Sequence, residues 1–355
     1  MADGTNPYDP FVRGPYPVGV RTIEAPDTAR DRSFPCEIWY PADFRHQGQD
    51  TDPATQDVFT APSERSQRRQ MAVRDALARD GTYPLILFSH SSGGDRKQST
   101  FLCTHLSSHG YVVSAADHSE RVAAGLTHRD GETGEQRTRR LEVVIASRVP
   151  DIRFLLAHLL ATAWDPAITV DSTRIGIVGH SFGGWTALAA IDVEPKIGAV
   201  VALAPGGASE RKPGILPLRL EFAWGRDVPV LYLVAENDTS LPLAGMYELF
   251  ARTPATRRML ILRRADHAHF MDNAEELHEA FRSMPLTGAL ADLQKEMQPF
   301  AELCSEREAQ VFVRGLTVAH FDARLKQREE AVGFWAEDID GRLASRGIEA
   351  ILHQT

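Results

Sequence analysis

The sequence predicts an α/β protein with a doubly wound, mostly parallel sheet, helices on both sheet faces and a helical C-terminal extension. From about residue 85 onward, strand-like and helix-like segments alternate. The strand-like segments at 85–88 and 197–203 are unbroken apolar runs, which are typical of parallel strands buried on both faces. A third strand-like segment, 174–178, runs into a glycine-rich turn and a helix of small residues at 185–191.

The N-terminal part of the chain is expected to add antiparallel strands. Residues 17–24 (PVGVRTIE) and 34–41 (FPCEIWYP) alternate between apolar and polar side chains, a pattern that favours an opening pair of antiparallel strands. The composition then turns polar between residues 45 and 82. We expect a long surface loop there, with one charged helix near residues 66–79.

The remaining elements follow in alternation. A helix is predicted at 98–108, a strand at 111–115, and a polar loop that reaches about Arg140. Residues 141–163 carry one apolar stripe at helical spacing, which predicts an amphipathic helix. Further strands are predicted at 228–234 and 259–262, and the last ~70 residues should contain helices without further strands.

Composition and charge exclude several classes of protein. The 355 residues include 39 Lys and Arg against 48 Asp and Glu, and 43% are hydrophobic. This is the composition of a soluble globular protein. The net charge of −9 argues against a nucleic-acid binder, because such proteins carry basic patches. No run of about 18 apolar residues predicts a membrane span.

The location of the protein follows from weaker signals. The first residues lack the basic and apolar regions of a secretory signal. The three cysteines, Cys36, Cys103 and Cys304, are far apart and show no CxxC spacing, so we expect reduced, mostly buried thiols. These features favour a cytoplasmic protein, and homo-oligomerisation stays open.

The strongest functional signal is a serine in a strand–turn–helix context. The segment Gly179-His180-Ser181-Phe182-Gly183-Gly184 follows the 174–178 strand. This is the G-x-S-x-G nucleophile elbow in the setting that it requires. Glycines allow the close backbone approach that lifts the serine above the sheet edge. The sequence therefore predicts Ser181 as a nucleophile.

A serine nucleophile needs a base that is oriented by a third group. In this fold class the acid and the histidine follow the serine in the chain, on loops after later strands. The loop after 228–234 offers Asp238, with Glu236 as the fallback. The loop after 259–262 offers His267, with His269 as the alternative.

A metal site is the competing interpretation of the loop that contains His267. Asp266, His267, His269 and Asp272 could be read as metal ligands. No second cluster with ligand spacing accompanies them, so no metal or other cofactor is predicted. His180, inside the elbow, is expected to pack or to form a hydrogen bond rather than to act as a second base.

The oxyanion hole should combine two backbone N–H groups. One should belong to Phe182, directly after the nucleophile, and the other to the loop after the 85–88 strand. In that loop, Ser89-His90-Ser91-Ser92-Gly93-Gly94, Ser92 is the predicted donor and Ser91 the second choice. For the substrate pocket we expect Ser91, Trp185, Phe270 and Met271.

These residues give the chain a resemblance to the α/β-hydrolase superfamily, and within it to the platelet-activating factor acetylhydrolase-like and dienelactone hydrolase-like serine esterases. The segments that carry the resemblance span residues 15–285; they are EIWYPA (37–42), YPLILFSH (83–90), RVPDIRF (148–154), GHSFGG (179–184) and the Asp266-His267 loop. The resemblance implies a sheet of about eight strands and ester hydrolysis through Ser181, Asp238 and His267. Dienelactone hydrolases proper use a cysteine, so Ser181 argues against that activity.

The sequence thus predicts a serine hydrolase that cleaves small-molecule carboxylic esters with short or compact acyl groups. Thioesters, amides or polyesters on the same catalytic residues are the alternatives, followed by a noncatalytic hydrolase-like binding protein. Because the three residues belong to one predicted sheet, residues 1–355 are expected to form a single domain. Residues 286–355 are expected to be a helical extension within it, and the region 286–316 is the candidate lid.

Overall fold

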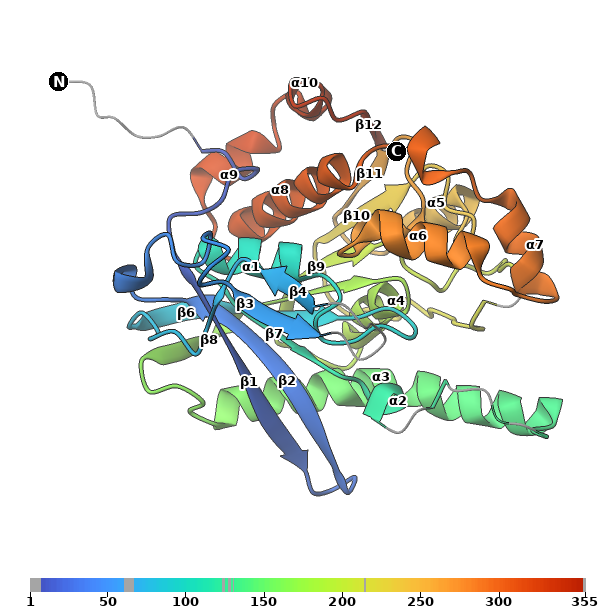
Figure 1. The fold of residues 1–355 in the computed structure, drawn as a ribbon, viewed down its shortest axis with the longest axis horizontal. Helices are drawn as coiled ribbons and strands as arrows, with labels where there is room; N and C mark the ends of the chain where they lie inside the picture. Colours follow the sequence, from blue (N-terminus) through green and yellow to red (C-terminus); the bar gives the residue numbers. More distant parts are fainter. Residues whose placement is uncertain are drawn as a thin grey trace.

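The fold is built on a large, mostly parallel sheet, seen in a computed structural model that describes residues 8–60, 67–122, 125–126, 129, 131–213 and 215–353 (Figure 1). Within these residues the sheet has ten strands, in the order β12-β11-β10-β9-β8-β6-β7-β2-β1-β5. The predicted doubly wound α/β class is confirmed, while the expected number of about eight strands is too low.

Six neighbouring strands at the centre run parallel. They are β11 (Arg257–Leu262), β10 (Val230–Ala235), β9 (Ile197–Leu203), β8 (Ile168–His180), β6 (Gly81–Ser89) and β7 (Val112–Ala116). The predicted opening pair, β1 (Val18–Asp27) and β2 (Arg32–Pro41), is antiparallel, and β2 joins the sheet antiparallel to β7. The carboxyl ends of the six parallel strands therefore meet at one edge, where the site loops begin.

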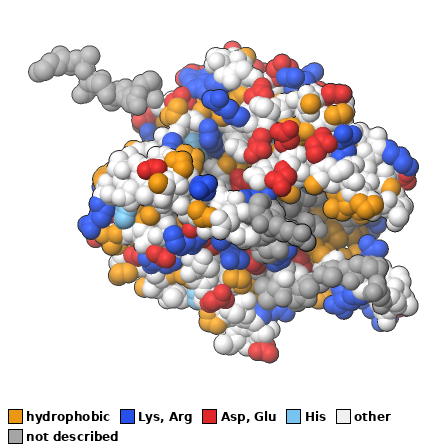
Figure 2. Space-filling model, viewed as in Figure 1, with side chains coloured by type: hydrophobic (Ala, Val, Ile, Leu, Met, Phe, Trp, Pro, Cys, Tyr) orange, Lys and Arg blue, Asp and Glu red, His pale blue; other side chains and the backbone are white. Residues whose placement is uncertain are grey.

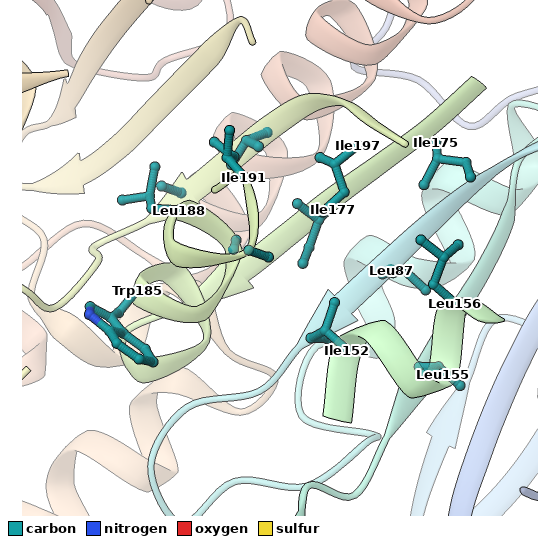
Figure 3. Packing of buried hydrophobic residues seen from close by; sticks show 14 of the residues in the cluster. Leu87, Ile152, Leu155, Leu156, Ile175, Ile177, Trp185, Leu188, Ile191 and Ile197 are labelled. Carbon is teal, nitrogen blue, oxygen red and sulfur yellow. The ribbon is translucent and has the colours of Figure 1, made fainter. Parts of the chain in front are cut away.

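Helices cover both faces of the sheet. One hydrophobic cluster packs α3 (Gly134–Ala161), α4 (Phe182–Ala190) and α5 (Leu243–Arg252) against one face (Figure 3). The other cluster packs α1 (Thr100–Ser108) and α8 (Glu306–Arg324) against the opposite face. Successive strand residues alternate between the clusters, as Ile177 and Val178 do on β8, because side chains on a strand point to opposite faces.

The C-terminal part combines core helices with helices that stand above the sheet edge. Helix α8 is a core element, since Phe312, Leu316 and Phe321 on it are fully buried. Helices α6 (Ala274–Ser283) and α7 (Ala289–Glu296) project to one side, above the level of α3 (Figure 1). The short helices α9 (Glu329–Phe334) and α10 (Ile339–Ala344) follow α8, and the chain returns to the sheet as β12 (Ala350–His353), antiparallel to β11. The prediction of no further strands is therefore wrong.

The polar segment 45–82 also differs from its prediction. It contains a short turn of 3₁₀-helix (Phe44–His46) at its start, the hairpin β3 (Asp57–Thr60) and β4 (Gln67–Gln70), and the edge strand β5 (Val73–Arg74). The predicted helix is absent from residues 67–79, the part of its range that the structure describes. Gln70 is buried and bridges the Trp39 indole N–H and the Asp57 carboxylate. These tertiary hydrogen bonds favour the extended conformation over a charged helix.

The loop predicted to reach Arg140 is shorter than expected. Helix α2 (Ser119–Val122) follows β7, and α3 already begins at Gly134. A capping box between Thr133 and Gln136 satisfies the first N–H groups of α3. The first turns of α3 extend beyond the sheet, on the side where α6 and α7 also project (Figure 1).

The turn from β8 into α4 leaves no room for side chains at its glycines. A Cβ atom on Gly183 would lie 1.9 Å from the Ser89 carbonyl oxygen at the end of β6, and one on Gly179 would lie 2.1 Å from the Gly183 oxygen. Glycine is therefore required so that the start of α4 can rest directly on the backbone of the neighbouring strand.

We predict that Gly183→Ala lowers the free energy of unfolding by about 1–3 kcal/mol, because the methyl group must displace rigid backbone. Gly333→Ala in α9 is the matched control, since a Cβ there meets nothing within 4 Å. The control should be neutral or stabilising by up to about 1 kcal/mol, as alanine is the better helix former. Urea denaturation measures both values, and equal stabilities of the two variants would contradict the packing argument.

Candidate active site

Ser181 sits in a strained conformation at the start of α4. Its backbone angles are φ 59° and ψ −114°, a region that residues with a side chain rarely adopt. Its N–H donates to the Leu203 carbonyl oxygen (2.8 Å), and its own carbonyl oxygen accepts from Gly206 N (3.1 Å). These bonds to the end of β9 and the loop after it hold the turn. The amino end of α4 directly after Ser181 favours negative charge there.

His267 and Asp238 form a hydrogen-bonded pair on the loops after β11 and β10. The Nδ1 atom of His267 lies 2.7 Å from Asp238 Oδ2. The other carboxylate oxygen accepts the N–H groups of Ser240 (2.9 Å) and Leu241 (2.7 Å). Burial alone would lower the pKa of His267, but the Asp238 carboxylate raises it above the usual 6.5. Ser181 and His267 line the same pocket.

The alternative residues of the two loops point elsewhere. Glu236 accepts the Arg264 N–H (3.0 Å) and pairs with Arg263 (2.9 Å). His269 is fully buried, and its ring is bonded to the Asp266 backbone and to the Cys304 carbonyl oxygen. Burial lowers the pKa of His269 to about 4. His269 thus stabilises the loop and does not line the pocket.

The carboxylates beside His267 also bond to backbone. Asp266 accepts the N–H groups of His267 and Thr239. Asp272 accepts those of Thr100 and Phe101, where it joins the histidine loop to the first turn of α1. Burial raises the pKa of Asp272 to about 6. Among the described residues, no group of three or more His, Cys, Asp or Glu side chains could hold a metal ion.

His180 packs against the imidazole ring of His267. Its side chain is fully buried, and the two imidazole ring centroids lie 4.6 Å apart. Burial, reinforced by the nearby His267, keeps the pKa of His180 well below its usual value. The Gln98 amide nitrogen lies 3.1 Å from its Nδ1 atom. A neutral imidazole at this place packs against His267 and holds the loop of Gln98.

The three residues predicted for the oxyanion hole lie at the pocket. Ser91, Ser92 and Phe182 all line it. The Ser91 N–H is already bonded to Gln98 Oε1 (2.8 Å). Within the described part of the chain, the N–H groups of Ser92 and Phe182 have no protein acceptor. The two N–H groups without an acceptor therefore belong to Ser92 and Phe182, the two residues that the sequence predicts first as oxyanion donors.

The pocket above Ser181 has a volume of about 630 Å³ and is mostly apolar. Three groups of side chains enclose it, from α3 and the loop before it, from the loop after β9, and from α6 and α7; they include Leu126, Leu141, Ile215, Leu216, Leu218, Leu277, Phe281, Met284, Leu290 and Leu293. Hydrophobic side chains are visible in the hollow between the two projecting parts of the molecule (Figure 2).

Two of the four residues predicted for the pocket do not line it. Ser91 and Met271 do. Trp185 is buried, and its indole N–H donates to the Arg219 carbonyl oxygen (2.7 Å). Phe270 is fully buried against His180 and the core. Both aromatic side chains pack in the buried core, so the prediction that they line the pocket is wrong.

Sequence reasoning missed most of the pocket wall. The candidate lid at 286–316 covers Leu290, Leu293 and Met297, but the wall begins earlier, with Leu277 and Phe281 on α6. The i, i+4 spacing of these two residues was an available signal for an apolar helix face. The contribution of Leu141 on α3 had no such signal, because it depends on how far that helix projects.

Comparisons with known proteins find similarity to ester hydrolases. Residues 56–149 match the family model of platelet-activating factor acetylhydrolase, isoform II. A platelet-activating factor acetylhydrolase from Cavia porcellus is 23% identical over 314 residues, which cover 74% of this chain and 68% of that protein. A cutinase from Thermobifida alba is 24% identical over 197 residues, covering 55% of this chain and 56% of the cutinase.

A solved structure shares the fold. The ferulic acid esterase from Streptomyces cinnamoneus matches with a TM-score of 0.64 at 22% identity, over 99% of this chain and 98% of the esterase. The fold and the elbow define an α/β-hydrolase. The chain is a serine ester hydrolase, and its similarity to platelet-activating factor acetylhydrolases confirms the resemblance seen in the sequence.

We predict that Asp238→Asn lowers kcat for p-nitrophenyl acetate by about 10⁴-fold, because the amide no longer holds the required tautomer of His267. In the wild type, kcat/KM should fall as the pH drops through the raised pKa of His267, above 6.5. In Asp238→Asn, the residual kcat/KM should fall at a lower pH than in the wild type, because the carboxylate that raises the pKa of His267 is absent. Glu236→Gln is the control and should stay within threefold of the wild type. A larger loss in Glu236→Gln than in Asp238→Asn would overturn the assignment of Asp238.

Proposed function

We propose that this protein hydrolyses small carboxylic esters through Ser181, His267 and Asp238. The observation that best supports this proposal is the hydrogen-bonded Asp238–His267 pair. His267 and Ser181, the residue of the strained turn, line the same pocket. Ser181 Oγ attacks the ester carbonyl while His267 takes its proton. His267 then protonates the leaving alcohol, and an acyl-enzyme remains. Water, activated by the same histidine, releases the acid, while Asp238 stays ionised and orients the imidazole.

The N–H groups of Phe182 and Ser92 donate hydrogen bonds to the negatively charged oxygen of the tetrahedral intermediate. Both groups lack a protein acceptor within the described residues. Preorganised donors of this kind contribute on the order of 3 kcal/mol each to transition-state stabilisation. The amino end of α4 adds a favourable field at the same place.

The substrate is an ester whose apolar part is compact enough to fit between α3 and the α6–α7 pair. A short or compact acyl group leaves room for an apolar alcohol in the pocket of about 630 Å³. Thioesters, amides and polyesters are the alternatives that the same residues could attack. The walls that rise on both sides of Ser181 favour a small molecule over a polymer chain.

Three further parts of the proposal concern the whole chain. We treat residues 1–355 as one domain, in which α7 within the 286–355 extension serves as a lid. We also propose a cytoplasmic location, which the three buried and unpaired cysteines fit. In the described residues no helix is long and apolar enough to cross a membrane.

We predict that Ser181→Ala reduces hydrolysis of p-nitrophenyl acetate to the background rate while the melting temperature stays near that of the wild type. A fluorophosphonate probe should label the wild type and not the variant. Retained turnover in Ser181→Ala would contradict the proposal that Ser181 is the nucleophile. An absence of labelling in the folded wild type would favour the noncatalytic binding protein.

The lid proposal predicts a chain-length effect. Leu293 on α7 lines the pocket, and the larger side chain of Leu293→Trp should occupy part of its volume. The substitution should therefore lower kcat/KM for p-nitrophenyl octanoate about tenfold more than for the acetate. The size of this difference corresponds to a few apolar contacts of the chain. Val332→Trp on the exposed face of α9 is the control. Equal effects of Leu293→Trp on both esters would place the pocket elsewhere.

A further inference from the structure

Arg148 on α3 is a fully buried arginine that the proposed catalytic steps do not use. Its guanidinium lies under the loop after β6. One nitrogen, Nη1, donates to the carbonyl oxygen of His90 (2.7 Å) and to Ser89 Oγ (3.3 Å). The other, Nη2, donates to the carbonyl oxygen of Ser91 (3.1 Å). Arg148 therefore binds the backbone of the loop that carries Ser92.

The same guanidinium also contacts the second half of the predicted oxyanion hole. Its central carbon lies 4.0 Å from the centroid of the Phe182 ring, a cation–π geometry. Glu120 on α2 pairs with Nη2 at 2.5 Å and offsets the buried charge. A buried charge is costly unless it is paired and hydrogen-bonded. The position of Arg148 is thus fixed between the Phe182 side chain and the loop.

The bonds to the two carbonyl groups determine where the next N–H groups point. Among the described residues no peptide bond is cis. In a planar trans peptide the N–H lies opposite the carbonyl oxygen. With the Ser91 carbonyl turned toward Arg148, the Ser92 N–H faces the other side, and Ser92 borders the pocket with Ser181. With the His90 carbonyl turned the same way, the Ser91 N–H also faces away from Arg148.

Gln98 holds the loop from that other side. Its Oε1 atom accepts both the N–H (2.8 Å) and the hydroxyl (2.6 Å) of Ser91. Its amide nitrogen lies 3.1 Å from Nδ1 of His180, the residue that packs beneath His267. Gln98 thereby occupies the Ser91 N–H and leaves that of Ser92 free. It also connects the loop to the elbow.

We propose that Arg148 and Gln98 are positioning residues that clamp the segment Ser89–Ser92 and aim the Ser92 N–H at the developing oxyanion. Neither residue touches the reacting atoms; each acts through the loop backbone. The inference deepens the proposed function and rests on it. A clamp of this kind acts on the transition state, so its loss should lower kcat and leave KM nearly unchanged.

The test compares Arg148→Lys and Gln98→Ala with the controls Arg153→Lys and Gln310→Ala. Arg153 is on the same helix but half exposed, where it pairs with Glu194. Gln310 donates to Glu306 on its own helix, far from the loop after β6 in the sequence. Active sites are first counted by complete reaction with a fluorophosphonate. Then kcat and KM for p-nitrophenyl acetate are measured per active site, together with the inhibition constant of a trifluoromethyl ketone.

Each clamp variant should lose at least tenfold in kcat per active site, with KM within threefold of the wild type. Removing an oxyanion donor outright costs 10²–10³-fold, and a misdirected donor should cost part of that. The trifluoromethyl ketone, which mimics the tetrahedral intermediate, should bind more weakly by a similar factor. The two controls should remain within twofold in all three constants.

A purely structural role would give a different result. Fewer active sites would be counted, but kcat per counted site and the affinity for the ketone would be those of the wild type, and this outcome would overturn the proposal. If Arg148→Lys does not fold, the partly exposed Gln98 decides the question alone. The proposed function fails separately, if the wild type shows no turnover that depends on Ser181.

Discussion

The close contact between the first turn of α4 and the end of β6 is the constraint on which the site depends. Gly183 lies against the carbonyl groups of Ser89 and His90, with no space for a Cβ atom. This contact brings the Phe182 N–H next to the loop that carries Ser92. Ser181, two residues before Gly183, has a positive φ angle, and its hydrogen bonds to Leu203 and Gly206 hold this conformation. The strain is tolerated because the surrounding backbone determines the turn from several sides.

The other parts of the site are connected to this contact through side-chain hydrogen bonds and one contact between imidazole rings. Asp272 and Ser99 join the histidine loop to the beginning of α1. Gln98, just before that helix, joins the loop after β6 to His180. His180 in turn packs beneath His267. The proposed base His267, the turn of the proposed nucleophile Ser181 and the predicted oxyanion donors are therefore connected to one another, and a shift in one loop should change the position of the others.

The sequence allowed much of this to be predicted, for identifiable reasons. The central strands and the elbow are strong local signals, since few folds place a G-x-S-x-G turn directly after an unbroken apolar run. Asp238 and His267 followed from chain order, but the choice against Glu236 and His269 required the geometry of the loops. Trp185 and Phe270 were assigned by proximity in sequence, which does not report which side of an element a side chain faces.

The pocket walls and the Arg148 clamp depend on tertiary contacts that leave little trace in the sequence. Leu141 and Phe281 meet at one pocket only because α3 and α6 project in the same direction. Arg148 was visible as part of a conspicuous segment, yet an arginine on a helix reads as a surface residue until its burial is seen. Likewise, β12 pairs with β11 from a distant part of the chain, and local propensity does not encode such pairing.

The central claim is that Ser181 forms an acyl-enzyme, and acid-quenched mixing with p-nitrophenyl acetate tests it most directly. Peptide mapping by mass spectrometry after the quench should find one acetyl group on the peptide that contains Ser181, at the residue itself. The amount should match the early burst of p-nitrophenol. Turnover without any acetylated peptide, or acetylation at another residue in proportion to the burst, would contradict the account.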